Sequence, residues 1–180
     1  MTPANPGVPY PNTYWILPKR LLAGEHPIEI SDDLSKTRLA GLLHSGIRTF
    51  VNLTEEREGE SYHRLLREIA DGLRVEISYV RVPIVDRGIP SAQTMRHILD
   101  LVDHSLAEER PAFVHCFAGL GRTGTVVGCY LRRHNLALKE NLLATIAELR
   151  RYMPVGPECS PHTPEQVWMA QNWSEVLGKP

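Results

Sequence analysis

A cysteine and an arginine separated by five residues, Cys116 and Arg122, lie in one glycine-rich segment and could together perform phosphate chemistry. The thiolate is the nucleophilic form of cysteine, and a free thiol with a pKa of about 8.5 is only slightly ionised at neutral pH. A following helix N-terminus, inward-facing backbone N–H groups and the Arg122 cation would all favour the thiolate. The planar guanidinium could also bind two phosphate oxygens at once. These residues therefore predict a phosphate site built around a nucleophile.

The same segment fits a second anion-binding pattern, because Gly119, Gly121 and Gly124 match the G-x-G-x-x-G of dinucleotide-binding folds. That fold requires a further strand after the helix, with an acidic residue about 20 residues on. Residues 132–151 instead have a helical pattern, and no strand pattern follows them. A phosphate loop with Gly-Lys-Ser/Thr is excluded because those residues are missing. A buried, inert cysteine would leave the spacing to Arg122 unexplained, so the thiol interpretation is favoured.

Strands and helices that alternate along the chain must position this segment. Short apolar runs bounded by turn residues predict strands at 20–23, 49–53, within 74–85 and at 112–115. Asp32 or Asp33 is expected to cap a helix that ends near Gly46, and Ser91 is expected to cap another. Three further helices are predicted, from within the glycine-rich segment to about 133, at about 139–152, and after a capping box at 163–166.

This alternation predicts an α/β fold with a small, mostly parallel central sheet of four to five strands flanked by helices. We expect residues 1–14, which are rich in proline, to form an extended N-terminal arm, and residues 15–180 to form a single domain. The charged segment 55–60 is expected to be a solvated surface loop or the start of a helix.

Composition limits the partners and the compartment. The net charge of −1 gives no support for binding to nucleic acid or to an anionic membrane. No apolar run approaches the roughly 18 residues that span a bilayer, and the first residues do not resemble a secretory signal. Three cysteines, at 116, 129 and 159, form no C-x-x-C pair, so a disulfide framework and a structural zinc site are not expected. We expect a cytoplasmic monomer.

Residues His115–Thr123 match the H-C-x-x-G-x-x-R-S/T signature of cysteine-dependent protein tyrosine phosphatases. The wider sequence resembles the compact atypical dual-specificity group of that superfamily, in the segments NTYWILPKRLLAGEHP and LLHSGIRTFVNLTEE. The segment GRTGTVVGCYL resembles the helix that follows the catalytic loop in this group and in the Cdc14-like phosphatases. The resemblance extends from about Trp15 to Trp168 and implies a phosphatase catalytic domain with the fold of this superfamily.

The resemblance also implies roles for other residues. The family takes its general acid from an aspartate about 30 residues before the cysteine, and Asp86 lies there, after a predicted strand and before a capped helix. Asp100 and Asp103 are expected to face solvent instead. His115 resembles the histidine that organises the loop, and Thr123 resembles the hydroxyl that assists thiolate departure, although it would also suit a helix N-cap. Gln166 resembles a glutamine that positions the hydrolytic water, although the capping box alone would account for it.

The predicted phosphate-binding loop indicates the class of substrate. It comprises Phe117, Ala118, Gly119, Leu120, Gly121 and Arg122. Relatives that hydrolyse phosphoinositides often carry lysines in this loop, whereas Phe117 and Leu120 are apolar and no basic cluster in the sequence compensates. A protein phosphorylated on tyrosine alone, or on tyrosine and on serine or threonine, is therefore the expected substrate. A small ester such as an inositol phosphate, and a phosphate-binding module without turnover, are the alternatives. The expected mechanism uses no metal and no cofactor.

Overall fold

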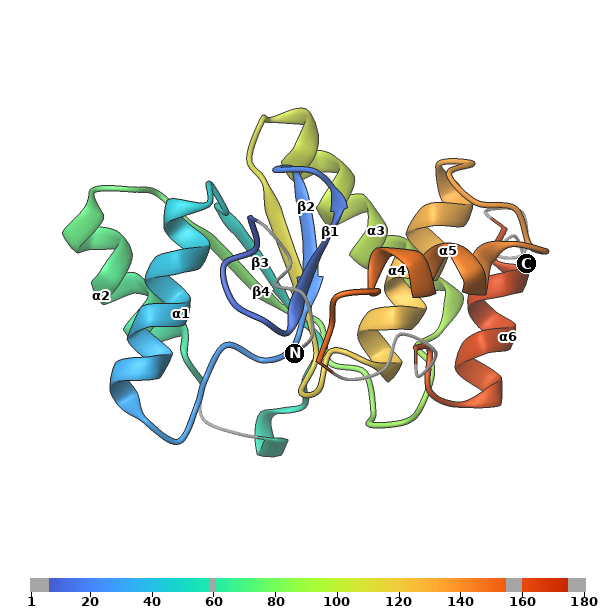
Figure 1. The fold of residues 1–180 in the computed structure, drawn as a ribbon, viewed down its shortest axis with the longest axis horizontal. Helices are drawn as coiled ribbons and strands as arrows, with labels where there is room; N and C mark the ends of the chain where they lie inside the picture. The colour runs from blue at the N-terminus through green and yellow to red at the C-terminus, as the bar shows by residue number, and fades with distance from the viewer. Residues whose placement is uncertain (1–6, 59–60, 155–159, 175–180) are drawn as a thin grey trace.

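The computed structural model describes residues 7–58, 61–154 and 160–174 (Figure 1). Five strands form one sheet in the order β1-β2-β5-β3-β4. They are β1 (Thr13–Leu17), β2 (Leu21–Gly24), β3 (Thr49–Asn52), β4 (Ser78–Arg81) and β5 (Ala112–His115). The helices are α1 (Asp32–His44), α2 (His63–Leu73), α3 (Ala92–Ala107), α4 (Gly121–Arg133), α5 (Leu142–Leu149) and α6 (Pro164–Asn172), with a short 3-10 turn at Glu56–Glu58. The expected α/β class with a small, mostly parallel sheet is confirmed.

Strand β5 lies at the centre of the sheet and carries the signature to its carboxyl end. It pairs in parallel with β2 on one side and β3 on the other, and all four of its residues are buried. Parallel strands covered on both faces have such continuous apolar runs. Ligand sites of open α/β sheets lie beyond the carboxyl ends of the strands. Cys116, which follows β5 directly, is therefore placed at the middle of that edge.

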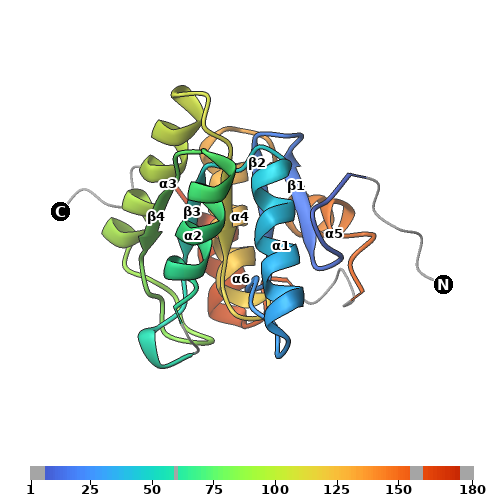
Figure 2. The same ribbon diagram turned by 90° about the vertical axis from the view of Figure 1, so that its left-hand side faces the viewer.

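Helices cover both faces of the sheet with separate apolar clusters. Figures 1 and 2 show α1 and α2 on one face and α3 to α6 on the other. On the first face, the leucines of α1 and α2 pack against Phe50 and Phe113 of the sheet. On the second face, α4 is almost entirely buried between the sheet and α6. A Cβ at Gly128 would lie 2.6 Å from Ala170 Cβ, so this glycine allows α4 and α6 to pack closely.

The sequence missed two elements. Strand β1 pairs antiparallel with β2 and includes Thr13 and Tyr14, so the sheet begins inside the expected arm 1–14. Tyr10, also in that segment, is buried in the core, whereas residues 1–6 lie outside the described ranges. Helix α2 was not anticipated, although its strong amphipathic pattern buries Leu66 and Ala70 against the sheet.

Some predicted helix ends were wrong, and others are confirmed. Ser31, rather than Asp32 or Asp33, is the N-cap of α1, and its side chain makes no capping hydrogen bond. Helix α5 is shorter at both ends than the predicted range 139–152, because residues 139–141 and 150–152 form turns. The Ser91 cap of α3 and the capping box of α6 are confirmed. Among the described residues, none of the helices has both the length and the apolar character needed to cross a bilayer.

Candidate active site

The loop between β5 and α4 is held from outside by hydrogen bonds to its carbonyl groups. The His26 backbone N–H donates to the Phe117 carbonyl at 2.9 Å, and the buried Arg150 guanidinium donates to the Gly119 carbonyl at 2.9 Å. The Ser160 hydroxyl donates to the Leu120 carbonyl at 2.8 Å. Carbonyls that point away from the pocket leave its interior to backbone N–H groups, which suits an anion.

One glycine in this loop is required by its backbone conformation and its surroundings. Gly119 has a left-handed φ of 69°, and a Cβ there would lie 2.5 Å from the Gly24 carbonyl carbon of β2. Only glycine allows the loop to turn this closely against the neighbouring strand. The glycine at position 119 of the G-x-G-x-x-G pattern is therefore required by the close approach of the loop to β2, without reference to a nucleotide.

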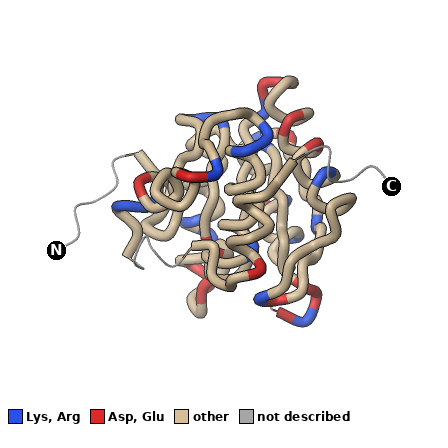
Figure 3. Tube along the Cα trace, turned by 90° about the vertical axis from the view of Figure 1, so that its right-hand side faces the viewer, with Lys and Arg blue, Asp and Glu red and all other residues tan. Residues whose placement is uncertain are grey.

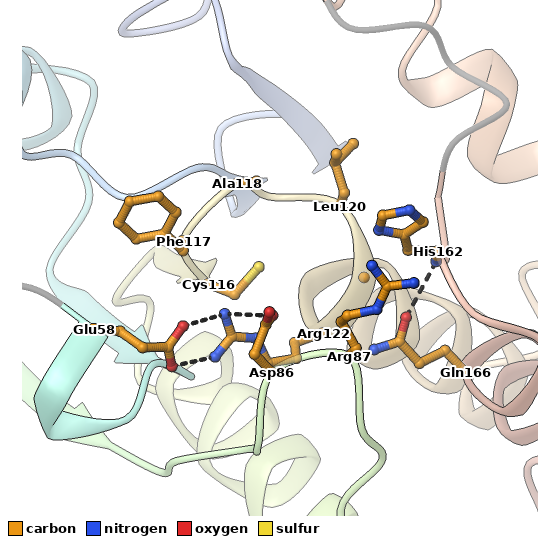
Figure 4. A pocket seen from close by; sticks show the side chains of 11 residues that line it. Glu58, Asp86, Arg87, Cys116, Phe117, Ala118, Leu120, Arg122, His162 and Gln166 are labelled. Atoms are coloured by element: carbon orange, nitrogen blue, oxygen red, sulfur yellow. Dashed lines mark hydrogen bonds and ion pairs between the residues drawn. The ribbon is translucent and has the colours of Figure 1, made fainter.

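A pocket opens above the loop, and Figure 4 shows the Cys116 thiol directed into it. The structure brings the predicted Cys116, Arg122, Asp86 and Gln166 together there. The pocket is lined by Glu58, Asp86, Arg87, Cys116, Phe117, Ala118, Leu120, Gly121, Arg122, His162 and Gln166. Figure 3 shows the charged residues of the chain from another side, with both signs distributed over the molecule. An anionic ligand would thus be attracted by local groups rather than by the overall charge.

The Arg122 guanidinium is held at the floor of the pocket by acidic and carbonyl groups. Its Nη1 donates to Glu58 Oε2 at 2.5 Å and to the Ile84 carbonyl at 3.1 Å, and its Nη2 donates to Glu58 Oε1 at 2.7 Å. Nη2 also lies 3.1 Å from Asp86 Oδ1. The Arg122 Nε is buried and has no partner among the described residues. Both Nη atoms of the guanidinium are thus engaged, whereas, within the described ranges, the hydrogen-bonding capacity of Nε is unused.

The position of Glu58 differs from the prediction that segment 55–60 is solvated surface, as a loop or the start of a helix. This carboxylate is 18% exposed and paired with Arg122, so it belongs to the pocket rather than to a solvated surface. The hydrogen bond from Arg122 lowers the pKa of Glu58, which keeps the carboxylate ionised. Residues 59–60 lie outside the described ranges. No periodicity marks Glu58 as different from its charged neighbours, so sequence reasoning had no signal for it.

Asp86 lies in the segment between β4 and α3, which is tethered to the N-terminus of α6. The Thr163 hydroxyl donates to the Arg87 carbonyl at 3.3 Å, and the Gln166 amide donates to the Gly88 carbonyl at 2.9 Å. The Asp86 side chain is 64% exposed and lies beside Arg122. Asp100 and Asp103 instead pair with Arg133, outside the pocket.

His115 is buried beneath the loop, and its hydrogen bonds define its tautomer. Nδ1 lies 3.0 Å from the Cys116 carbonyl, which can only accept, so Nδ1 carries the hydrogen. Nε2 then accepts from the Tyr62 hydroxyl at 2.6 Å. Burial lowers the pKa of His115 well below its usual value, and the neighbouring His26 adds to this effect. A neutral imidazole with both nitrogens engaged supports the loop and cannot take a proton from the thiol.

Thr123 and Gln166 have structural partners that sharpen their expected roles. Thr123 is not an N-cap, because α4 begins at Gly121 and Leu120 is the N-cap; its hydroxyl donates to the Gly24 carbonyl at 3.4 Å. Gln166 is fully buried, and its Oε1 accepts from the backbone N–H groups of His162 and Thr163 at 3.2 and 3.1 Å. Both lone pairs of the Gln166 oxygen are therefore occupied.

Sequence reasoning missed other groups near the thiol. Tyr62 supports His115, and Arg87 and His162 line the pocket. No basic cluster was expected to compensate for the apolar loop residues, and Arg87, a single cation that lies next to Asp86 on the pocket wall, was not placed by the sequence. Cys116 is a free cysteine, Cys129 is buried in α4, and Cys159 lies outside the described residues.

Stability should decrease as the pH falls from 7 to 5. Burial, followed by the charge of Arg81, lowers the pKa of His26 to about 4, and the pKa of His115 is also depressed. The unfolded chain therefore binds more protons than the folded chain below a pH of about 6.5. Each such histidine removes up to about 1.4 kcal/mol of unfolding free energy per pH unit in this window. Urea denaturation at both pH values measures the loss, which His26→Gln should reduce. His104→Gln is the exposed control, and equal pH dependence in both variants would refute the assignment.

A model of a known family matches residues 29–135, which include β5, the loop and the whole of α4. Its description is "Tc-R-P: Polymorphic toxin system, DSP-PTPase phosphatase". The chain belongs to this family. The predicted relationship to the atypical dual-specificity phosphatases is thus confirmed, and the family is one of phosphatases, which are phosphoric monoester hydrolases.

Curated relatives of this phosphatase domain include Cdc14 proteins. The chain is 26% identical over 150 residues to dual specificity protein phosphatase CDC14C of Homo sapiens, covering 80% of this chain and 31% of the relative. It is 30% identical over 149 residues to CDC14AB of Danio rerio, covering 80% and 23%. The chain thus spans less than a third of the length of these relatives.

Solved structures of phosphatases share the fold. The crystal structure of Tk-PTP in the active form has a TM-score of 0.68 at 22% identity and covers 89% of this chain and 94% of its own. PTPMT1 in complex with PI(5)P has a TM-score of 0.63 at 19% identity, with 86% and 90% covered. At these identities the likeness supports the fold of the domain rather than its substrate.

Proposed function

We propose that this phosphatase domain hydrolyses phosphate monoesters of proteins, on tyrosine and also on serine or threonine, through a cysteinyl-phosphate intermediate. The observation that carries the proposal is that Cys116, Arg122 and Asp86 line one pocket, with Asp86 Oδ1 3.1 Å from Arg122 Nη2. Within the described residues, the buried Nε of Arg122 has no hydrogen-bond partner. A buried N–H donor without a partner is costly. A phosphate oxygen would satisfy it at the position where the thiolate can attack phosphorus.

The first step transfers the phosphoryl group to the enzyme. The loop N–H groups and the Nε–H of Arg122 bind the phosphate oxygens, and the Cys116 thiolate attacks phosphorus. The sulfur–phosphorus bond forms as the ester bond breaks, and Asp86 gives its proton to the departing oxygen. His115 takes no proton in this step. It holds the Cys116 carbonyl and thereby the orientation of the thiol.

The second step releases phosphate. Asp86, now ionised, accepts a proton from a water molecule that attacks phosphorus, and the sulfur–phosphorus bond breaks. The Thr123 hydroxyl is proposed to donate to the departing thiolate in place of its long contact with the Gly24 carbonyl. The Gln166 oxygen already accepts two hydrogen bonds, so it is poorly suited to position the hydrolytic water. We propose instead that the Gln166 amide N–H holds the Asp86 segment by donating to the Gly88 carbonyl.

An aromatic phosphate ester suits the edge of this pocket. Phe117 is 58% exposed there and Leu120 also lines the pocket, so the entrance offers apolar contact to a phosphotyrosine ring. The test is release of phosphate from matched phosphotyrosine, phosphoserine and inositol phosphate substrates, with EDTA present. We expect hydrolysis of the peptides, faster for phosphotyrosine. Hydrolysis of the inositol phosphate alone would favour the small-ester alternative, and binding without turnover would favour a non-catalytic module.

Asp86→Asn should slow hydrolysis according to the basicity of the leaving group. Asparagine cannot donate a carboxylic proton, so a phosphotyrosine peptide should lose about 10²-fold or more in kcat/KM. The activated p-nitrophenyl ester needs less protonation and should lose much less at the phosphorylation step. Steady-state kinetics on both esters measure the difference, with Asp100→Asn as the matched control outside the pocket. An equal loss on both esters would remove Asp86 as the acid.

A further inference from the structure

The charged and polar side chains of the pocket are arranged unequally around Cys116. Figure 4 shows Glu58 at one edge, with the Arg87 guanidinium and the His162 imidazole toward the opposite edge. Arg122 lies between these edges, already paired with Glu58 and Asp86. One side of the pocket therefore carries carboxylates, and the other carries a cation and an imidazole.

Arg87 is a cation without an ion-pair partner among residues 7–58, 61–154 and 160–174. Its backbone has a left-handed φ of 62°, and its carbonyl accepts a hydrogen bond from the Thr163 hydroxyl at 3.3 Å. The next carbonyl, of Gly88, is held by Gln166 at 2.9 Å. The backbone at Arg87 is thus fixed from α6, while the side chain is left to face the pocket.

His162 reaches the same wall from the segment before α6. Its backbone N–H donates to Gln166 Oε1 at 3.2 Å, and two residues earlier the Ser160 hydroxyl donates to the Leu120 carbonyl at 2.8 Å. A Cβ at Gly124 would lie 2.1 Å from Ser160 Oγ, so this segment packs tightly on α4. The imidazole itself is exposed and, within the described residues, makes no hydrogen bond.

We propose that Arg87 and His162 form a subsite for a second anionic group of the substrate, next to the phosphate that reacts at Cys116. The proposal rests on the proposed phosphatase function and narrows its substrate class. The expected substrate is a phosphopeptide with an acidic residue or a second phosphoresidue beside the reacting one. The guanidinium would bind this group with paired N–H donors, and the imidazole would add one more.

The one-sided arrangement favours a peptide over a polyphosphorylated inositol. A ring that carries phosphates all round would bring one of them toward Glu58, where like charges repel. A peptide can direct a single additional anion to the Arg87 edge. The exposed apolar side chain of Phe117 in the pocket lining, together with exposed Val85 and Ile89 in the segment that carries Asp86 and Arg87, also suits a peptide better than a polyol.

The test compares three phosphotyrosine peptides that differ only in the residue next to phosphotyrosine. This residue is alanine, aspartate or phosphoserine. The readout is the ratio of kcat/KM for the acidic peptide to that for the alanine peptide. We expect a ratio of about 10 in the wild type, and a fall of about fivefold or more in Arg87→Gln. Arg87→Lys should keep part of the preference, and His162→Gln should lower it less. Arg64→Gln removes a cation from a 91% exposed position on α2 and should leave the ratio unchanged.

Binding of the same peptides to Cys116→Ser separates this proposal from the phosphatase function. Tighter binding of the acidic peptides, lost when Arg87→Gln is added, would support the subsite even if turnover were absent. Equal ratios in the wild type and Arg87→Gln would overturn it, whatever the activity. An inositol bisphosphate that outcompetes every peptide, with the same loss in Arg87→Gln, would overturn the peptide assignment. Circular dichroism and thermal unfolding establish that each variant is folded.

Discussion

Cys116→Ser should reduce phosphate release by at least about 10³-fold, because a serine hydroxyl at the base of this loop is not ionised near neutral pH and is a poor nucleophile. The substitution changes one atom in a side chain that is only 2% exposed, so the loop and its hydrogen bonds should survive. The variant should therefore still bind a phosphotyrosine peptide. Single-turnover phosphate release and calorimetric binding measure the two properties separately.

Cys129→Ser is the matched control for this change. Cys129 is buried in α4, within the core and outside the pocket lining, so the same atom is exchanged away from the chemistry. Any loss of stability in this variant should leave the activity of the folded fraction unchanged. Retention of wild-type activity by Cys116→Ser would reject the cysteinyl-phosphate mechanism. Loss of peptide binding by a folded Cys116→Ser would show that the thiol acts in binding rather than in catalysis.

The parts of the site that lie close together in the sequence could be predicted from it. The end of β5, the loop and the start of α4 are contiguous, and local rules for strands, glycine turns and helix N-termini determine their shape. Asp86 could also be placed, because it follows a strand whose carboxyl end lies at the same edge of the sheet. These inferences need only the topology of a parallel sheet.

The parts that depend on contacts between distant segments could not be predicted. Glu58 lies 64 positions before Arg122, in a run of charges where nothing distinguishes it. Gln166 was recognised as a cap, yet its donation to the Gly88 carbonyl, 78 positions away, depends on how α6 packs on α4. Strand β1 was missed because proline-rich residues precede it and its partner is a strand of only four residues. In each case the local sequence fitted more than one structure, and packing between distant segments determined which one formed.

Arg122→Lys should lower kcat/KM for a phosphotyrosine peptide by about 10²- to 10³-fold, although the charge is kept. The guanidinium donates to Glu58 and to the Ile84 carbonyl through its Nη atoms and forms an ion pair with Asp86. Its Nε has no partner among the described residues and is proposed to bind phosphate. A single ammonium group cannot make both sets of contacts from one position. Glu58→Gln, which keeps a hydrogen-bond acceptor but removes the charge, should cost much less.

Steady-state kinetics of Arg122→Lys distinguish two roles of the guanidinium: binding the transition state in a fixed plane, or acting only as a positive charge. If Arg122 binds the transition state in a fixed plane, Arg122→Lys should lower kcat as well as raise KM, whereas loss of charge attraction alone would act mainly on KM. Arg64→Lys makes the same exchange on the exposed face of α2 and should change neither constant. Activity of Arg122→Lys within about threefold of the wild type would show that planar recognition is not required. The Glu58–Arg122 pair would then serve to neutralise charge in the pocket rather than to orient the guanidinium.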